Sequence, residues 1–202
     1  MSELLIETPF QLDNIDWHDL NDIEKNKQQF KIFNSNKYKK LVEKLTNHAS
    51  VYKVGSEYFC LDNEFKAITY YMKYEVGNNG KLGSYVWQSL VWTEPSAEYI
   101  KHFPEKIFFN DLLTKFGTIL TDSEQTWDGR RFWKHRIVES FDKQLNVYFY
   151  DFSNHNLIQI EDNSHFRMTE LVHDIWGNSN KHKMKRMIIT NKELPIKTKE
   201  RT

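Results

Sequence analysis

The chain has 202 residues, of which 39% are hydrophobic and 15% aromatic, with seven Gly and four Pro. This composition excludes an intrinsically disordered chain and supplies large apolar groups for a core. Lys plus Arg and Asp plus Glu each number 28, so the sequence lacks the basic excess of a strongly electrostatic nucleic-acid binder. We expect a single domain over residues 1–196 and a mobile tail at 197–202.

The start of the sequence, MSELLIETPFQLDNIDW, does not have a positive leader followed by an apolar stretch. No window reaches the roughly 18 apolar residues that a membrane span requires. Cys60 is the only cysteine, and its place within SEYFCLD predicts a packed strand position rather than a nucleophile. We therefore expect a soluble, cytoplasmic protein that makes no membrane contact.

The first third of the chain changes from a helical to an alternating pattern. Residues 3–10 are a weak strand candidate, and two amphipathic helices are predicted next, over 17–33 and 38–45. Alternating apolar residues then predict antiparallel strands. These strands lie at 51–55, 57–62, 65–76 and 85–93, and the segment GNNGKLGS at 77–84 is the strongest loop signal.

The second half alternates helices with strands. A helix is predicted over 100–116, ended by Gly117, and TIL then forms a short buried strand. After the polar turn TDSEQTWDG, Thr126 or Asp128 is suited to cap a helix on which Trp133 faces the core. The remaining predicted elements are strands at NVYFYDF and LIQI, a helix over 166–175 and a last strand, KRMIIT.

This order predicts an α+β fold with a central mixed, mostly antiparallel sheet flanked by helices. Together with residues 85–141, it resembles the acetyltransferase fold of the GNAT superfamily. The segments FFNDLLTKFGTILTDSEQTWDGRRFW, VYFYDF and DIWG resemble uncharacterised GNAT-like proteins of bacterial viruses and their hosts. The resemblance in element order covers most of the chain, and the resemblance in sequence covers mainly 84–190.

The resemblance implies a binding site for acetyl-CoA or another acyl-CoA. In the superfamily, the strand that matches 85–93 splays from its neighbour and pairs with the pantetheine arm, which here assigns Ser89, Leu90, Val91 and Trp92 to the cofactor. A glycine-containing loop then holds the pyrophosphate through backbone amides and the positive end of a helix.

The corresponding loop in this chain departs from the family pattern. It reads EPSAEYIKHFPEK, residues 94–106, and contains no glycine, while Pro104 removes one amide donor. Lys101 and His102 are therefore the candidates to meet phosphates with charge in place of amides.

The polar turn after TIL holds the candidate catalytic carboxylates. Glu124 or Asp122 would orient or deprotonate an amine nucleophile, as acyl transfer to nitrogen requires. The same residue types would also serve only to cap a helix. In the superfamily a tyrosine in the region of Tyr148 and Tyr150 protonates the leaving thiolate, and strand alternation places these two on one face.

Other motifs carry less information. His155, His165 and His173 have spacings of ten and eight residues, which match no helical ligand pair, so no metal site is expected. The basic run at 181–186 is typical of a solvated face, and phosphate binding is retained for it as a secondary hypothesis.

Two hypotheses for the function follow. The first is an acyl-CoA-dependent N-acyltransferase that acts on an amine of a small molecule or a protein. The second is a catalytically inert GNAT-like protein, viral or chromosomal, that binds another protein or a nucleic acid through its aromatic and basic surfaces. The missing glycines favour the second hypothesis, and the polar turn favours the first. Whether the chain is an enzyme, and in which oligomeric state, stays open.

Overall fold

The computed structural model describes residues 17–123, 127–177 and 179–195. The predicted strand at 3–10 and the predicted tail at 197–202 lie outside these residues. The chain divides into two compact units, Met1–Lys73 with Leu90–Lys101 and Tyr74–Ser89 with His102–Thr202, and each is described by itself. The single domain expected over 1–196 stays a prediction.

The first unit consists of two short helices followed by strands. Its elements are α1 (Trp17–Asn21), α2 (Ile23–Ser35), β1 (Lys40–Lys44), β2 (Ala49–Val54), β3 (Glu57–Asp62) and the 3-10 turn η1 (Glu98–Ile100). Two long strands, β4 (Ala67–Asn79) and β5 (Gly83–Thr93), contribute residues to both units.

The second unit alternates helices and strands. Its elements are α3 (Phe103–Lys106), the π-helix η2 (Ile107–Leu113), α4 (Thr114–Phe116), β6 (Thr118–Leu120), α5 (Trp127–Asp142), β7 (Asn146–Asp151), β8 (Asn156–Ile160), α6 (Asn163–His173), α7 (Asn180–Lys183) and β9 (Lys185–Thr190).

Within the described residues, the strands form a nine-stranded sheet in the order β1-β2-β3-β4-β5-β6-β9-β7-β8. Strands β5 and β6 pair in parallel, whereas β6 with β9, β9 with β7 and β7 with β8 pair antiparallel. The predicted α+β class with a mixed, mostly antiparallel sheet is therefore confirmed. The last strand in sequence, β9, lies between β6 and β7.

The first unit is held by an aromatic core beneath α2. Its buried members are Leu20, Phe30, Phe33, Phe59, Leu61, Ile68, Tyr71 and Trp92. The Asp22 carboxylate caps α2 by accepting from the amides of Glu24 and Lys25, as helix N-termini require.

The prediction of a helix over 38–45 is wrong, because Lys40–Lys44 form the strand β1. The spacing of Leu41, Val42 and Leu45 fits a helical face, but Leu41 and Val42 are both exposed here. The segment pairs instead with β2, which satisfies its backbone groups. Tertiary pairing thus overrides a short apolar pattern.

The Asp62 side chain at the end of β3 is fully buried and organises the turn that follows. Its Oδ1 accepts from the amides of Glu64 at 2.9 Å and Phe65 at 3.1 Å, and its Oδ2 accepts from the Tyr99 hydroxyl. His48 Nε2 lies 3.7 Å from the same Oδ2. The neighbouring Cys60 is completely buried, as predicted, and burial raises the pKa of its thiol to about 11.

In the second unit, the loop predicted at 77–84 is shorter than expected. Strand β4 continues through Asn79 and β5 begins at Gly83, so only 80–82 connect them. The Asn79 side chain accepts from the Lys81 amide at 2.8 Å, and Gly83 has a φ of 68°. These two features close a tight turn within a segment whose composition is typical of a loop.

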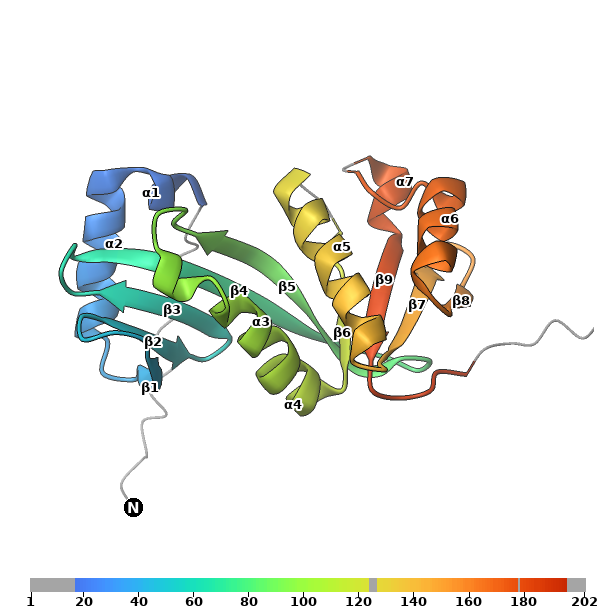
Figure 1. Cartoon of the computed structure of the whole chain (residues 1–202), viewed down its shortest axis with the longest axis horizontal. Helices are drawn as coiled ribbons and strands as arrows, with labels where there is room; N and C mark the ends of the chain where they lie inside the picture. Colours follow the sequence, from blue (N-terminus) through green and yellow to red (C-terminus); the bar gives the residue numbers. More distant parts are fainter. Residues whose placement is uncertain (1–16, 124–126, 178, 196–202) are drawn as a thin grey trace, which may run out of the picture. The chain divides into compact units, whose positions relative to one another are not determined.

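The helical segment 103–116 connects the two parallel strands. Gly117 ends it with a φ of 75°, as predicted, and the buried strand β6 follows at once. Helix α5 then packs against β7, and α6 packs against β8 (Figure 1). Trp133 on α5 is buried, which confirms its predicted place in the core.

The opposite face of the second unit's sheet carries its own core cluster. Its buried members are Leu82, Leu120, Tyr148, Tyr150, Leu157, Ile188 and Leu194, against which Tyr85, Trp87 and Phe152 pack with partial exposure. None of the helices in the described ranges combines the length and apolarity that a membrane span needs.

Candidate functional site

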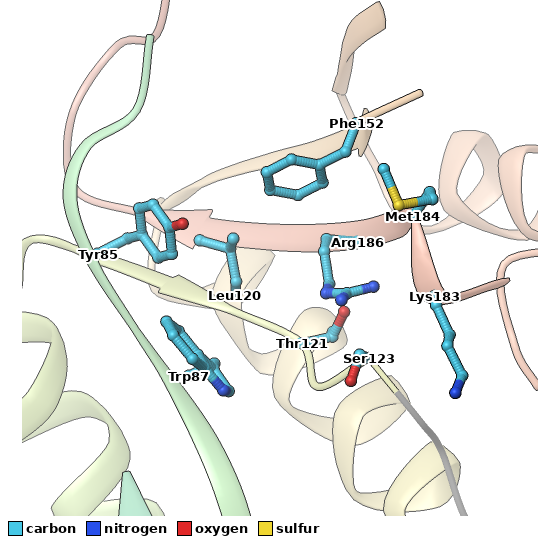
Figure 2. A pocket seen from close by; sticks show the side chains of 9 residues that line it. All are labelled: Tyr85, Trp87, Leu120, Thr121, Ser123, Phe152, Lys183, Met184 and Arg186. Carbon is cyan, nitrogen blue, oxygen red and sulfur yellow. The ribbon is translucent and has the colours of Figure 1, made fainter. Parts of the chain in front are cut away.

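A pocket of about 270 Å³ opens on this face of the second unit, beside the partly exposed aromatic residues. Tyr85 and Trp87 from β5 form one wall, with ring centroids 5.9 Å apart. Phe152 lies on another side, with Leu120 and Met184 completing the apolar lining (Figure 2). The walls are therefore mainly aromatic.

The backbone of β4 sets the position of one wall. A Cβ at Gly77 would lie 2.6 Å from the Tyr85 ring, closer than any side chain tolerates. Glycine at 77 thus lets the Tyr85 ring lie directly on the neighbouring strand, which is the usual reason for glycine inside a strand.

The polar groups of the pocket gather around Arg186. The side chains of Thr121 and Ser123 lie below its guanidinium, and Lys183 lies at the edge (Figure 2). The Arg186 Nη1 donates to the Lys185 carbonyl at 2.8 Å. Burial lowers the pKa of Arg186, and the charges of Asp122 and Tyr85 act in the opposite direction.

The predicted catalytic carboxylates divide between described and undescribed residues. Asp122 directly follows Thr121, and its Oδ1 accepts from the Ser123 amide at 2.5 Å. This residue is half-buried next to the pocket. Glu124 and Thr126 lie outside the described residues, and Asp128 lies inside α5 rather than before it.

Both candidate tyrosines are completely buried in the core cluster. The Tyr148 hydroxyl accepts from the Leu194 amide at 3.1 Å, and the Tyr150 hydroxyl bonds His155 Nδ1 at 3.1 Å. Burial raises the pKa of Tyr150, although a hydrogen bond with Asn79 opposes this. Strand alternation places the two on one face as expected, and their role as proton donors stays a prediction.

The residues assigned to the acyl-CoA arm lie along β5. Ser89 and Leu90 are half-buried and Val91 is exposed, whereas the indole Nε1 of Trp92 donates to Asn21 at 3.0 Å in the first unit's core. Their backbone, rather than their side chains, is what the prediction requires.

The loop after β5 offers cations rather than free amides. The amides of Ala97 and Glu98 bond the carbonyls of Glu94 and Ser96, so these turn donors are already used. Lys101 and His102 are both exposed. His102 precedes α3 and makes no capping bond through its side chain.

One residue of β5 stands out although no motif marks it. Gln88 is only 4% exposed, and both its Nε2 and its Oε1 are buried without a hydrogen-bond partner among the described residues. Because side chains alternate along a strand, Gln88 lies on the face opposite Trp87. A buried unpaired amide costs roughly 1–3 kcal/mol, which a folded chain rarely carries without a reason.

The three histidines considered as metal ligands are engaged separately. His155 bonds Tyr150, His165 accepts from the Glu161 amide at 3.3 Å, and His173 stacks on Phe149 with ring centroids 4.5 Å apart. Within the part of the chain that the structure describes, no group of three or more His, Cys, Asp or Glu side chains is arranged to hold a metal ion.

His173 gives a pH prediction. Burial and the charge of Lys185 lower its pKa below the ordinary value of 6.5, against the opposing charge of Asp151. Around and below pH 6.5, the His173 side chain thus binds fewer protons in the folded chain than in the unfolded chain. The stability that depends on neutral His173 is complete above pH 6.5, and it is lost as the pH falls from 6.5 through the lower pKa of the folded chain. We expect urea unfolding to show a lower free energy of unfolding at about pH 5.5 than at about pH 7.5.

The matched variants separate His173 from other groups. His173→Phe keeps a ring on Phe149 and should reduce the pH difference, whereas His135→Gln, at an exposed position, should leave it unchanged. An unchanged pH difference in His173→Phe would show that other groups cause it.

Sequence reasoning did not single out Gln88, nor the walls of the pocket. A signal for Gln88 was present, since in an alternating strand it lies on the same face as the apolar residues Val86 and Leu90. The i, i+2 spacing of Tyr85 and Trp87 was a second signal, since it is typical of two side chains on one face of a strand. That Arg186 and Phe152 join them depends on β9 lying between β6 and β7, which no local pattern reveals.

Comparison of the chain with known protein families, with curated proteins and with solved structures found no match. Function is therefore inferred from the residues and geometry of the chain itself.

Proposed function

We propose that the chain is an N-acyltransferase that uses an acyl-CoA as donor and an amine as acceptor. The observation that carries the proposal is the combination of a parallel strand pair that ends early with an unpaired buried amide. Strands β5 and β6 pair only at Val86 with Ile119 and at Trp87 with Leu120. Strand β6 then ends, while β5 continues through Thr93.

This strand arrangement is what the GNAT-like interpretation requires. A strand that outruns its neighbour has backbone donors and acceptors available on that side, and an extended ligand can pair with them. The pantetheine arm of CoA carries two amide groups and suits such pairing. The stretch concerned follows Trp87 and includes Leu90, Val91 and Trp92, which the resemblance assigns to the arm.

Gln88 adds a polar side chain at the same place. Its amide is buried beside the last paired residue, Trp87, and both its donor and its acceptor are unused among the described residues. An amide of the ligand would supply both partners and recover the cost of burying Gln88. If position 88 had only a structural role, an apolar side chain, like those of Val86 and Leu90 on the same face, would be more stable there.

The loop after β5 offers fewer contacts to the phosphate groups of acyl-CoA than the family's glycine-containing loop does. The amides of the turn at 96–98 are largely used internally, so the exposed Lys101 and His102 would meet the phosphates with charge. Such contacts are screened by salt, so we expect affinity for acyl-CoA to fall as ionic strength rises.

The bound donor would supply an activated thioester carbonyl. Attack by the amine forms a C–N bond and breaks the C–S bond, and the nitrogen gives up a proton while the thiolate takes one. Asp122, or Glu124 outside the described residues, is the proposed acceptor of the first proton. Tyr148 or Tyr150 is the proposed source of the proton that the thiolate takes. This role requires the thiolate to reach the buried tyrosine hydroxyl. Most of the acceleration would come from positioning.

The test is calorimetric titration of the protein with acetyl-CoA and with CoA, beside Lys101→Glu and the control Lys115→Glu. We expect micromolar binding that Lys101→Glu weakens about tenfold. Lys115→Glu, at an exposed position on α4, should bind like the wild type. Absence of heat at millimolar ligand would overturn the acyltransferase proposal.

A second function, a binding protein without catalysis, is favoured by one observation. Helix α6 exposes Met168, Leu171 and Val172 by 66%, 82% and 74%, and their i, i+3, i+4 spacing puts them on one side. Apolar groups gathered in this way often mark a protein contact. Two results together would favour this function. The chain would not bind CoA, and it would form oligomers or capture a partner protein in a way that Leu171→Lys abolishes.

A further inference from the structure

The pocket beside Arg186 contains chemistry that the acyl-CoA proposal does not use. It lies on the Trp87 face of β5, whereas Gln88 lies on the other face. Its volume of about 270 Å³ is near the lower end of the range for small-molecule sites. The pocket is therefore large enough for a small organic molecule rather than for a single ion.

The charge in the pocket is positive and concentrated. Arg186 and Lys183 both line it. The Asp122 carboxylate lies outside the lining, where its charge acts on Arg186 and its Oδ1 accepts from the Ser123 amide. The guanidinium of Arg186 is directed toward the Thr121 and Ser123 side chains (Figure 2). One of its nitrogens, Nη1, donates to a backbone carbonyl. A guanidinium has further donors in a planar fork, which suits the paired oxygens of a carboxylate or phosphate.

The burial of Arg186 strengthens this reasoning. Arg186 is half-buried, and a charge that has lost part of its water gains more from an anionic partner than an exposed one does. The Phe152 ring, 5.9 Å from the guanidinium carbon, holds the side chain over the pocket.

The walls define the rest of the ligand. Tyr85 and Trp87 present adjacent rings, tilted by 38°, and Phe152 lies across the pocket from them (Figure 2). Phe152 is itself fixed, since it packs edge-on against Tyr150 and its amide donates to the Met184 carbonyl at 2.8 Å. Rings on two sides of a small pocket favour a flat apolar group between them.

We propose that this pocket binds a small organic anion, a carboxylate or a phosphate monoester, with its flat apolar body against the aromatic walls and its charged end at Arg186. The binding does not depend on acyl transfer. Should the chain transfer acyl groups, the same pocket would select an acceptor that carries a negative charge.

The test uses three probes of similar size: phenylacetate, phenyl phosphate and the neutral benzyl alcohol. Each is titrated into ¹⁵N-labelled protein while the amide resonances are followed. We expect at least one anion to bind, with the largest shifts at Tyr85, Trp87, Phe152 and Arg186, and benzyl alcohol to bind about tenfold more weakly. Binding of phenylacetate alone would identify a carboxylate site, and binding of phenyl phosphate alone a phosphate site.

The variants locate the charge. Arg186→Gln should weaken binding of the anion about tenfold or more, and Arg186→Lys should weaken it less because the charge remains without the fork. Lys181→Gln removes a cation of the same basic run that is exposed and paired with Asp174, and should have little effect.

Three results would overturn the proposal: no anion binding at about ten millimolar, equal binding of benzyl alcohol, or unchanged anion binding in Arg186→Gln. If Arg186→Gln does not fold, the same titration is made with Arg186→Lys. Weakened anion binding in this variant would then support the proposal, and unchanged anion binding would overturn it.

Discussion

Replacing Gln88 by methionine should stabilise the chain by about 1–2 kcal/mol while weakening its binding of acetyl-CoA about tenfold or more. Methionine fills a similar volume without placing an unpaired donor and acceptor in the interior. If the Gln88 amide is kept for a ligand, its removal improves the free protein and impairs the complex. Urea unfolding measures the first effect, and calorimetric titration measures the second.

The matched control is Gln159→Met on β8, where the side chain is exposed. This change should alter neither stability nor binding by more than about 0.5 kcal/mol, since the amide is solvated in both states. A destabilised Gln88→Met would mean that the amide has a partner in solution. A stabilised variant with unchanged acetyl-CoA binding would mean that the ligand does not reach it.

Replacing Asp62 by alanine should lower the free energy of unfolding by about 3 kcal/mol. The change leaves the amides of Glu64 and Phe65 and the hydroxyl of Tyr99 without their acceptor, inside a turn where the carboxylate is fully buried. Thr69 Oγ1, at 3.2 Å, remains for the Tyr99 hydroxyl, so the two amides carry most of the loss. Equilibrium unfolding in urea at about pH 7 gives the value.

Two variants separate the hydrogen bonds of Asp62 from its charge. Asp62→Asn keeps the acceptor for both amides and should cost about 1 kcal/mol. Glu64→Gln removes only the exposed charge that lies 3.3 Å from His48 and should cost less than about 0.5 kcal/mol. Equal losses in Asp62→Ala and Asp62→Asn would show that the charge, rather than the two amide bonds, supplies the stability.

The parts of the fold that the sequence predicts are those fixed by local chemistry. Gly117 ends a helix because its φ is positive, and the strand TIL that follows it is fully buried. The β7, β8 and β9 strands follow from alternating or continuous apolar runs with clear turns between them. In each case the residue types leave few alternatives.

The parts that the sequence does not predict depend on pairing at a distance. Residues 40–44 become a strand because β2 lies beside them, although the apolar spacing there fits a helix equally well. The turn at 80–82 is short because the long strands β4 and β5 continue into a segment rich in Gly and Asn. Neighbouring strands decide both outcomes, and a local window does not contain them.

The candidate site divides in the same way. Residues two apart in a strand lie on the same face, so the strand pattern indicates that Tyr85 shares a face with Trp87, and Tyr148 with Tyr150. That Tyr148 and Tyr150 are fully buried, and that Arg186 faces the aromatic walls, follows from the insertion of β9 between β6 and β7. Only the order of strands in the sheet brings these residues together.

The central claim is that an acyl-CoA pairs with β5 where it continues beyond Trp87. The most direct measurement is an amide NMR titration of ¹⁵N-labelled protein with acetyl-CoA, which also reports the side-chain amide of Gln88. We predict the largest shifts at the Gln88 side chain and at the backbone amides of 89–92, the residues of β5 that the resemblance assigns to the acyl-CoA arm. No shift at millimolar acetyl-CoA, or shifts confined to other elements, would contradict the claim.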